Sequence, residues 1–318
     1  MKPSTSSVSI WTKRIGKFVV CLFAAVLLAA GCSRKSKPDS NQPQAIATAP
    51  PTQTPQPSPT LKIEEERQSF RDYIVINRWD PNAFEGRLKV TKGGQTILDR
   101  QGGKFYVGSA ISEDNERQKP QPIAIGKDIT GEGKPNLVVM EWSGGAHCCS
   151  DYYVFELGES IREIAKITTG NPSGHFKDLD GDSRLEFITL DDTFAYWNTS
   201  YVDSPMPQVI LTFYDGAYHI AAKLMWKPAP SRAQLSRLAN RLRSQNQVVP
   251  GFFNSSELWG TMLNLIYTGH GDLAEQFFET AWNHKTQGKK EFYKEFQAQL
   301  RQSQYWPEIR EMNSSSRK

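Results

Sequence analysis

The apolar positions of the chain follow two different periods, and the change between them lies near residue 228. Before it, short runs of β-branched and aromatic residues alternate with turn residues, a pattern typical of strands. We expect strands within residues 72–77, 88–90, 95–98, 137–140, 152–155 and 187–190. Gly93 and Gly94 predict a tight hairpin, because glycine accepts the positive φ angles of such turns. Gly158 and Gly216 predict two further hairpins.

After this point the apolar residues recur at the spacing of helices. We expect Ser231, Ser256 and Asp272 to cap three helices, since a side-chain oxygen at that position accepts a free backbone N–H. Gly269 is expected to end the second helix. The apolar faces of the helices carry Leu235, Leu238, Leu242, Trp259, Met262, Leu263, Ile266, Phe277, Phe278, Trp282, Phe292, Phe296 and Leu300. The two periods predict a β-rich domain followed by a small all-α C-terminal domain.

The first 31 residues have the features of a targeting segment. Basic residues precede an uninterrupted apolar stretch, residues 18–30, which is too short to span a bilayer. The stretch ends in Leu28-Ala-Ala-Gly-Cys32, which resembles the bacterial lipobox. The resemblance implies cleavage before Cys32 and acylation of that cysteine, with the two or three chains that stable anchoring needs. An ordinary secretory signal and an uncleaved anchor are the alternatives.

The expected location is therefore the cell envelope, at the outer membrane or the periplasmic face in a bacterium with two membranes. Residues 32–60 form a disordered tether by composition, because 19 of the 28 residues after Cys32 are Pro, Gln, Ser or Thr. With the signal peptide over residues 1–31, this leaves the β-rich domain as residues 61–228 and the helical domain as residues 229–318.

The net charge depends on the targeting segment. The formal excess of +4 is carried by Lys2, Lys13, Arg14 and Lys17, and residues 1–31 contain no acidic residue. The chain that remains after cleavage is formally neutral. A nucleic-acid partner needs a concentrated basic surface. None is therefore expected, and the membrane is the partner that the sequence indicates, through the lipid anchor.

Two acidic loops of similar design begin at Asp128 and Asp178, and each leads into an apolar strand. Calcium prefers six to eight oxygen ligands, which a short loop offers by alternating carboxylates. The donors expected in the second loop are Asp178, Asp180, Asp182, Glu186 and the backbone carbonyl of Arg184. Thr189 stands where an EF-hand carries its bidentate glutamate, and a strand follows instead of a helix. The loop predicts a structural calcium site of a β-protein.

At these residues the chain resembles the FG-GAP and VCBS repeats, whose pattern is Asp-x-Asp-Gly-Asp-Gly-x-x-Asp before an apolar strand. The resemblance covers residues 126–225 and implies calcium-holding strand–loop–hairpin units of the β-propeller type. The first loop is a degraded copy with a weaker second site, at Asp128, Thr130, Glu132 and Asn136. Two units fall short of the four to eight blades of a closed propeller, so we do not expect a complete ring.

The segment between the loops contains His147, Cys148 and Cys149. With Cys21 removed in the signal and Cys32 acylated, Cys148 and Cys149 are the remaining thiols. Outside the cytoplasm we expect them to form a disulfide with each other. Buried unreactive thiols are one alternative. A metal or redox centre that also uses His147 is the other.

Recognisable catalytic motifs are absent from the sequence, so no catalytic residue is predicted. The function we expect is a calcium-stabilised, non-catalytic binding or interaction module of the envelope, with a protein or a glycan as partner. One alternative is an envelope hydrolase with a cleft between the β and helical domains, where Asp191 and Asp192 supply acid–base groups. The other is a redox or metal-handling protein that uses His147, Cys148 and Cys149.

Overall fold

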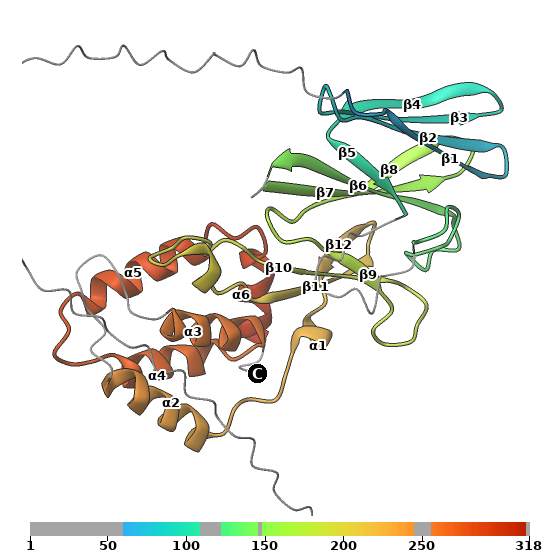
Figure 1. Ribbon diagram of the computed structural model, residues 1–318. Helices are drawn as coiled ribbons and strands as arrows, with labels where there is room; N and C mark the ends of the chain where they lie inside the picture. Colours follow the sequence, from blue (N-terminus) through green and yellow to red (C-terminus); the bar gives the residue numbers. More distant parts are fainter. Residues whose placement is uncertain (1–59, 109–121, 146–147, 245–255, 316–318) are drawn as a thin grey trace, which may run out of the picture. The chain divides into compact units, whose positions relative to one another are not determined.

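The computed structural model describes residues 60–108, 122–145, 148–244 and 256–315 (Figure 1). The described residues belong to one compact unit. The predicted signal peptide, the tether up to residue 59, Cys32 and His147 lie outside the described residues, as does the Cys148 side chain. Within the described part, no helix has the length and apolar character needed to cross a membrane.

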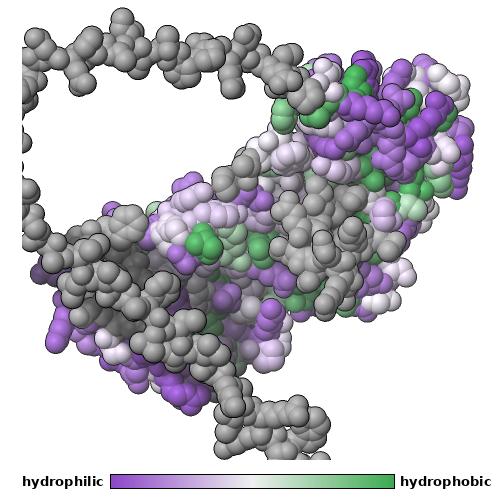
Figure 2. Space-filling model, viewed as in Figure 1, coloured by the Kyte–Doolittle hydropathy of each residue, from purple (hydrophilic) through white to green (hydrophobic). Residues whose placement is uncertain are grey.

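Twelve strands form three antiparallel sheets of four strands each within the described part. The first sheet has the order β1-β2-β3-β4, and each strand pairs with the next along the chain. Its strands are β1 Glu64–Phe70, β2 Tyr73–Asp80, β3 Glu85–Lys92 and β4 Gln95–Gly102. The predicted hairpin between β3 and β4 is confirmed, with φ of +55° at Gly93 and +82° at Gly94. Hydrophilic residues cover much of this sheet on the face shown in Figure 2.

The other two sheets carry the acidic loops. The second sheet has the order β5-β6-β7-β8, and the third has the order β12-β11-β10-β9. Their strands are β5 Lys104–Val107, β6 Asn136–Gly145, β7 Cys148–Leu157, β8 Ile161–Thr168, β9 His175–Lys177, β10 Glu186–Leu190, β11 Gln208–Tyr214 and β12 Ala217–Ile220. The coarse prediction is confirmed: the fold is β-rich, its described sheets form no closed barrel, and helices follow at the C-terminus. The repeat character stays a prediction.

Six helices and one short 3-10 turn complete the described part. They are the turn Tyr201–Asp203 and the helices α1 Ala222–Met225, α2 Arg232–Ser244, α3 Glu257–Tyr267, α4 Gly271–Ala281, α5 Lys289–Leu300 and α6 Trp306–Ser315. The Ser231 cap is confirmed, since its hydroxyl accepts the Gln234 N–H at 3.3 Å. Gly269 follows α3 with φ of +85°, as expected.

The other two predicted caps are wrong. Ser256 precedes α3 but makes no capping hydrogen bond, because its hydroxyl donates to the Asp203 carbonyl in a distant loop. Helix α4 begins one residue before Asp272, so that this residue lies in the first turn, where its negative charge still favours the helix N-terminus. In both cases a tertiary contact or a shifted helix start overrode the local sequence signal.

The middle sheet is buried on both faces, because successive side chains of a strand point to opposite sides. Val139 and Tyr153 face the first sheet in a core that also contains Leu88 and Val90. Their neighbours on the same strands, Met140 and Tyr152, join a second core. That core continues through Phe187, Trp259, Phe278 and Phe296 of the third sheet and the helices. The predicted boundary near residue 228 lies in a connection without helix or strand, and elements on both sides of it share this core.

Candidate functional site

The second acidic loop connects β9 to β10 and gathers three carboxylates. One carboxylate oxygen from each of Asp178, Asp180 and Glu186 lies within 4.8 Å of the other two. Like charges at such distances repel unless a cation lies among them. The cluster contains oxygen donors alone, which suits a hard cation such as calcium. These three residues are the candidate metal ligands.

Asp182 does not join the cluster. Its carboxylate accepts a hydrogen bond from the Arg184 Nε at 2.6 Å and another from the Arg184 backbone N–H at 2.9 Å. These bonds hold the pKa of Asp182 below its usual value. The structure therefore brings together three of the four predicted carboxylates. The fourth, that of Asp182, is hydrogen-bonded to the Arg184 guanidinium instead.

Backbone hydrogen bonds fix the shape of this loop. The Asp178 carboxylate accepts the N–H groups of Gly181 at 2.7 Å and Ser183 at 3.1 Å. Glu186 is buried, and its carboxylate accepts the Leu179 N–H at 2.9 Å and the Thr212 hydroxyl of β11 at 3.3 Å. The carboxylate that closes the loop thus also ties it to the neighbouring strand.

The first acidic loop makes the matching hydrogen bonds. Asp128 accepts the N–H groups of Gly131 at 2.8 Å and Gly133 at 2.7 Å, and the Asn136 amide oxygen accepts the Ile129 N–H at 2.9 Å. The chemistry differs, because Thr130 takes the place of Asp180 and Asn136 that of Glu186. The Thr130 hydroxyl donates to Asp128 instead of offering a charge.

The two loops meet each other and the third sheet. The Leu185 N–H donates to the Ile129 carbonyl at 2.9 Å, which joins one loop to the other. Glu132 of the first loop lines a small cavity together with Asp182 and Arg184 of the second.

The β12 residue Tyr218 lies close to both loops. Its hydroxyl is buried and has no hydrogen-bond partner among the described residues. Burial, with the negative charges of Glu186 and Asp128, raises the pKa of Tyr218. Strand β12, which carries Tyr218, therefore adjoins the candidate metal site.

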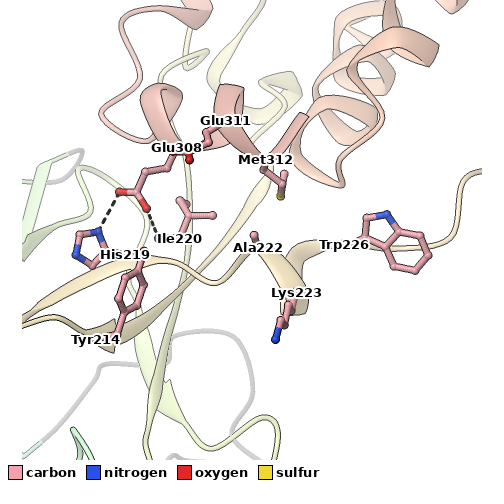
Figure 3. A pocket seen from close by; sticks show the side chains of 9 residues that line it. All are labelled: Tyr214, His219, Ile220, Ala222, Lys223, Trp226, Glu308, Glu311 and Met312. Atoms are coloured by element: carbon pink, nitrogen blue, oxygen red, sulfur yellow. Dashed lines mark hydrogen bonds and ion pairs between the residues drawn. The ribbon is translucent and has the colours of Figure 1, made fainter. Parts of the chain in front are cut away.

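A pocket of about 850 Å³ opens where the β11–β12 hairpin meets α1 and α6 (Figure 3). We call it the hairpin pocket. Its lining residues are Tyr214, His219, Ile220, Ala222, Lys223, Trp226, Glu308, Glu311 and Met312. Figure 3 shows Tyr214 and Trp226 at opposite ends, with Ala222 and Met312 between them. The pocket thus has an aromatic residue at each end and an apolar middle.

The Tyr214 end is polar and held in place by α6. Glu308 accepts the Ile220 N–H at 2.8 Å, and its other oxygen lies 3.5 Å from the His219 Nδ1. The Tyr214 ring lies against the His219 ring, with 4.4 Å between the centroids. Burial raises the pKa of Tyr214, and the charges of Glu308, Glu311 and Asp215 add to the effect. This end therefore has a negative potential.

The two end residues are exposed to the same extent. Trp226 is 51% exposed and Tyr214 is 50% exposed. Trp226 follows α1 directly, and its ring lies 6.1 Å from the His270 ring between centroids. The His270 Nε2 lies 2.6 Å from the Lys227 carbonyl oxygen, which anchors the chain just beyond the tryptophan.

Asp191, which the hydrolase alternative uses, lies inside the core. It is 5% exposed, and its carboxylate accepts the Thr193 N–H at 2.9 Å, the Thr193 hydroxyl at 2.5 Å, the Tyr267 hydroxyl at 2.5 Å and the Ser303 hydroxyl. Asp192 accepts the Asn171 N–H at 2.9 Å. Asp191 therefore joins the third sheet to the helices, and this arrangement disfavours a role in acid–base catalysis.

The cysteine segment is described in part. Cys149 is disulfide-bonded, and its backbone N–H donates to the Ser143 hydroxyl at 2.7 Å. The Trp142 indole donates to the Gly145 carbonyl at 3.2 Å, which closes the end of the β6–β7 hairpin. Since the Cys148 side chain lies outside the described residues, the bond between Cys148 and Cys149 stays a prediction.

Sequence reasoning missed the hairpin pocket. Its polar groups come from three separate segments: the β11–β12 hairpin, the chain around α1, and α6. Glu308 and Glu311 are three residues apart, a spacing that places both on one face of a helix. The sequence does contain one signal for this pocket, namely aromatic residues placed beside turn residues. Tyr214 directly precedes the Asp215-Gly216 turn, and Trp226 lies two residues before Pro228.

Two curated proteins resemble the chain. A probable thylakoid lumen protein of Synechocystis sp. is 25% identical over an alignment of 205 residues, and the alignment covers 55% of this chain and 59% of the relative. An uncharacterized protein of Sinorhizobium fredii is 25% identical over an alignment of 162 residues, and the alignment covers 42% of this chain and 25% of that relative. The chain thus spans less than two thirds of either relative. No family model and no solved structure matches it.

Proposed function

We propose that the protein is a non-catalytic binding protein of the cell envelope, anchored by lipid at Cys32, and that it binds its partner in the hairpin pocket. The observation that carries the proposal is the pair of half-exposed rings, Tyr214 and Trp226, at the two ends of this concave surface. Binding sites combine apolar and aromatic walls with a few fixed polar groups. The Glu308 carboxylate, held by the Ile220 N–H, is such a group.

The same proposal includes a calcium ion at Asp178, Asp180 and Glu186. Glu186 is bonded to Thr212 of β11, and Tyr218 of β12 lies beside it, so the ion would stabilise the hairpin that carries half of the pocket. Binding to the folded state alone contributes stability by mass action, about 2.7 kcal/mol at a hundredfold excess over Kd. Calcium is thus assigned a structural role.

The envelope location has two independent supports. One is the sequence that ends in Cys32, with its resemblance to a lipobox. The other is the similarity to a protein named as a probable thylakoid lumen protein, since a lumen is a compartment outside the cytoplasm. Replacement of Cys32 by Ala should release the protein from membranes into the soluble fraction.

Hydrogen–deuterium exchange tests the binding site directly. The full-length protein is mixed with solubilised envelope extract, and exchange is followed in β12 and α6. We expect protection of both elements in the native protein and none in the Tyr214→Ala, Trp226→Ala double variant. Tyr196→Ala is the matched control, because Tyr196 is an exposed ring that does not line the pocket. Absence of protection, or equal protection in the double variant, contradicts the proposal.

A further inference from the structure

We propose that the hairpin pocket binds the basic side chain, arginine or lysine, of a polypeptide ligand. This inference rests on the proposed function and names the ligand class for the same site. It follows from three properties of the pocket: its charge, its exposed rings and the order of polar and apolar groups along it.

The charge of the pocket favours a cation. Among its lining residues, Glu308 and Glu311 carry two negative charges and Lys223 one positive charge. Asp215 adds a third carboxylate whose field reaches the Tyr214 hydroxyl. Figure 3 shows the Lys223 amine directed away from Glu308. An anionic ligand would therefore be repelled at the Tyr214 end, and a neutral ligand could donate hydrogen bonds to the carboxylates but would lack the attraction between opposite charges.

The rings supply the second part of a cation site. One face of Tyr214 lies against His219, and half of the side chain remains open to solvent. A guanidinium or ammonium group binds to such a ring within about 6 Å of its centroid. Guanidinium is planar, so it can also form paired hydrogen bonds with a carboxylate. A basic head at this end would contact Tyr214 together with the carboxylates of α6.

The apolar middle fits the rest of such a ligand. Ala222 and Met312 lie between the polar end and Trp226 (Figure 3). Lysine and arginine carry a hydrocarbon stem behind the charged head, and such stems pack along apolar surface. Trp226 would then contact the peptide beyond the stem. The order of cationic head, stem and neighbouring residue therefore matches the order of groups along the pocket.

The protein already uses the same combination of groups within its own fold. The Arg100 guanidinium carbon lies 4.1 Å from the Tyr153 ring centroid, and Arg100 is ion-paired with Glu163 at 2.7 Å. Lys104 lies 5.6 Å from the Trp79 ring centroid and is ion-paired with Glu64 at 2.8 Å. In each case two rings and one carboxylate surround a cation. The hairpin pocket likewise places a ring, Tyr214, beside a carboxylate, Glu308, whose other neighbours are the Ile220 N–H and His219.

The test compares two peptides that differ by one charge. The probe is acetyl-Gly-Gly-Arg-Gly-Gly-amide, and its neutral counterpart has citrulline in place of arginine. Binding to the full-length protein is followed by the NMR signal of the Trp226 indole N–H, which is assigned with Trp226→Phe. We expect the arginine peptide to bind about tenfold more tightly, because the citrulline form loses the charge-assisted contacts. Raising the salt from about 0.01 M to about 1 M should weaken binding.

Matched variants locate the effect. Glu311→Gln keeps the shape and removes one charge, so it should weaken binding of the arginine peptide about two- to fivefold, as for an exposed ion pair. Glu295→Gln, an exposed position of α5 outside the pocket lining, should leave binding unchanged. Equal binding of the two peptides, or no shift of the Trp226 signal with either, would overturn the inference.

The two proposals fail in different ways. If an oligomer of β-1,4-linked N-acetylglucosamine shifts the Trp226 signal and the arginine peptide does not, the pocket is a binding site but not a cation site. If envelope extract protects β12 and α6 while both peptides leave Trp226 unchanged, the ligand class is again wrong and the proposed function stands. Absence of protection by the extract removes the proposed function itself.

Discussion

The two acidic loops share their backbone hydrogen bonds and differ in their side-chain charges. In each, the first aspartate accepts the N–H groups three and five residues further along the loop, and the last residue accepts one from near its start. The second loop adds Asp180 and Glu186 where the first has Thr130 and Asn136. The comparison teaches that hydrogen bonding alone can shape such a loop, and that the second loop adds the carboxylates that a metal ion would need.

The largest expected effect comes from making the second loop resemble the first. Glu186→Gln keeps an oxygen for the Leu179 N–H and removes one charge from the cluster. We expect the variant to lose the calcium response, about 2.7 kcal/mol of unfolding free energy at a hundredfold excess of calcium over Kd. In chelator its stability should be close to that of the native protein. Urea unfolding in calcium and in chelator measures both values.

A response to calcium that persists in Glu186→Gln would place the ion elsewhere. The control is Asn136→Gln in the first loop, which should change stability equally in calcium and in chelator.

Removing the first aspartate of the first loop tests the hydrogen bonds alone. Asp128→Ala leaves the N–H groups of Thr130, Gly131 and Gly133 without their acceptor. Unsatisfied groups of this kind cost about 1–3 kcal/mol, and partial exposure places the loss near the lower limit. We expect the loss to be independent of calcium, as measured by denaturant unfolding. A loss that calcium restores would mean that the first loop also holds metal.

The prediction from the sequence succeeded where the signal was local. The hairpin at Gly93 and the clustering of Asp178, Asp180 and Glu186 depend on a few neighbouring residues, and sequence spacing captures them. Asp182 shows the limit, because alternation along a loop does not decide which carboxylate a nearby arginine attracts.

The elements that the sequence did not reveal depend on distant partners. β1 consists largely of charged and polar residues, and it is a strand because its backbone pairs with β2 at the edge of the first sheet. The hairpin pocket combines Tyr214, Trp226 and Glu308, which are far apart in the chain. The spacing of residues along the sequence does not indicate which distant residues come into contact in the fold.

Two opposite substitutions test whether the two acidic loops have the same backbone at the matching positions Ser183 and Gly133. Both have positive φ, +73° and +76°, and a Cβ at Gly133 would meet open space. A non-glycine residue in this conformation costs about 1–2 kcal/mol. We therefore expect Ser183→Gly to stabilise the protein and Gly133→Ser to destabilise it by a similar amount, as measured by thermal unfolding. Equal signs for the two changes would contradict the structural match.

The smallest effect concerns pH and the Asp182–Arg184 pair. Hydrogen bonds from Arg184 lower the pKa of Asp182 from 3.8, so the pair adds stability above the unfolded pKa and loses it as pH falls through the folded pKa. Because the pair is exposed, we expect a small effect. Asp182→Asn should show a shallower loss of stability below pH about 4 than the native protein, in urea unfolding. An identical pH profile would show that the pair does not form in solution.

The central claim is that metal in the second loop orders the hairpin that carries the pocket. Hydrogen–deuterium exchange of residues 208–220, with calcium and with chelator, tests it most directly. We expect slower exchange in calcium for the native protein and no difference for Asp180→Ala, whose removed carboxylate belongs to the cluster. The same exchange rate in calcium and in chelator for the native protein would contradict the account.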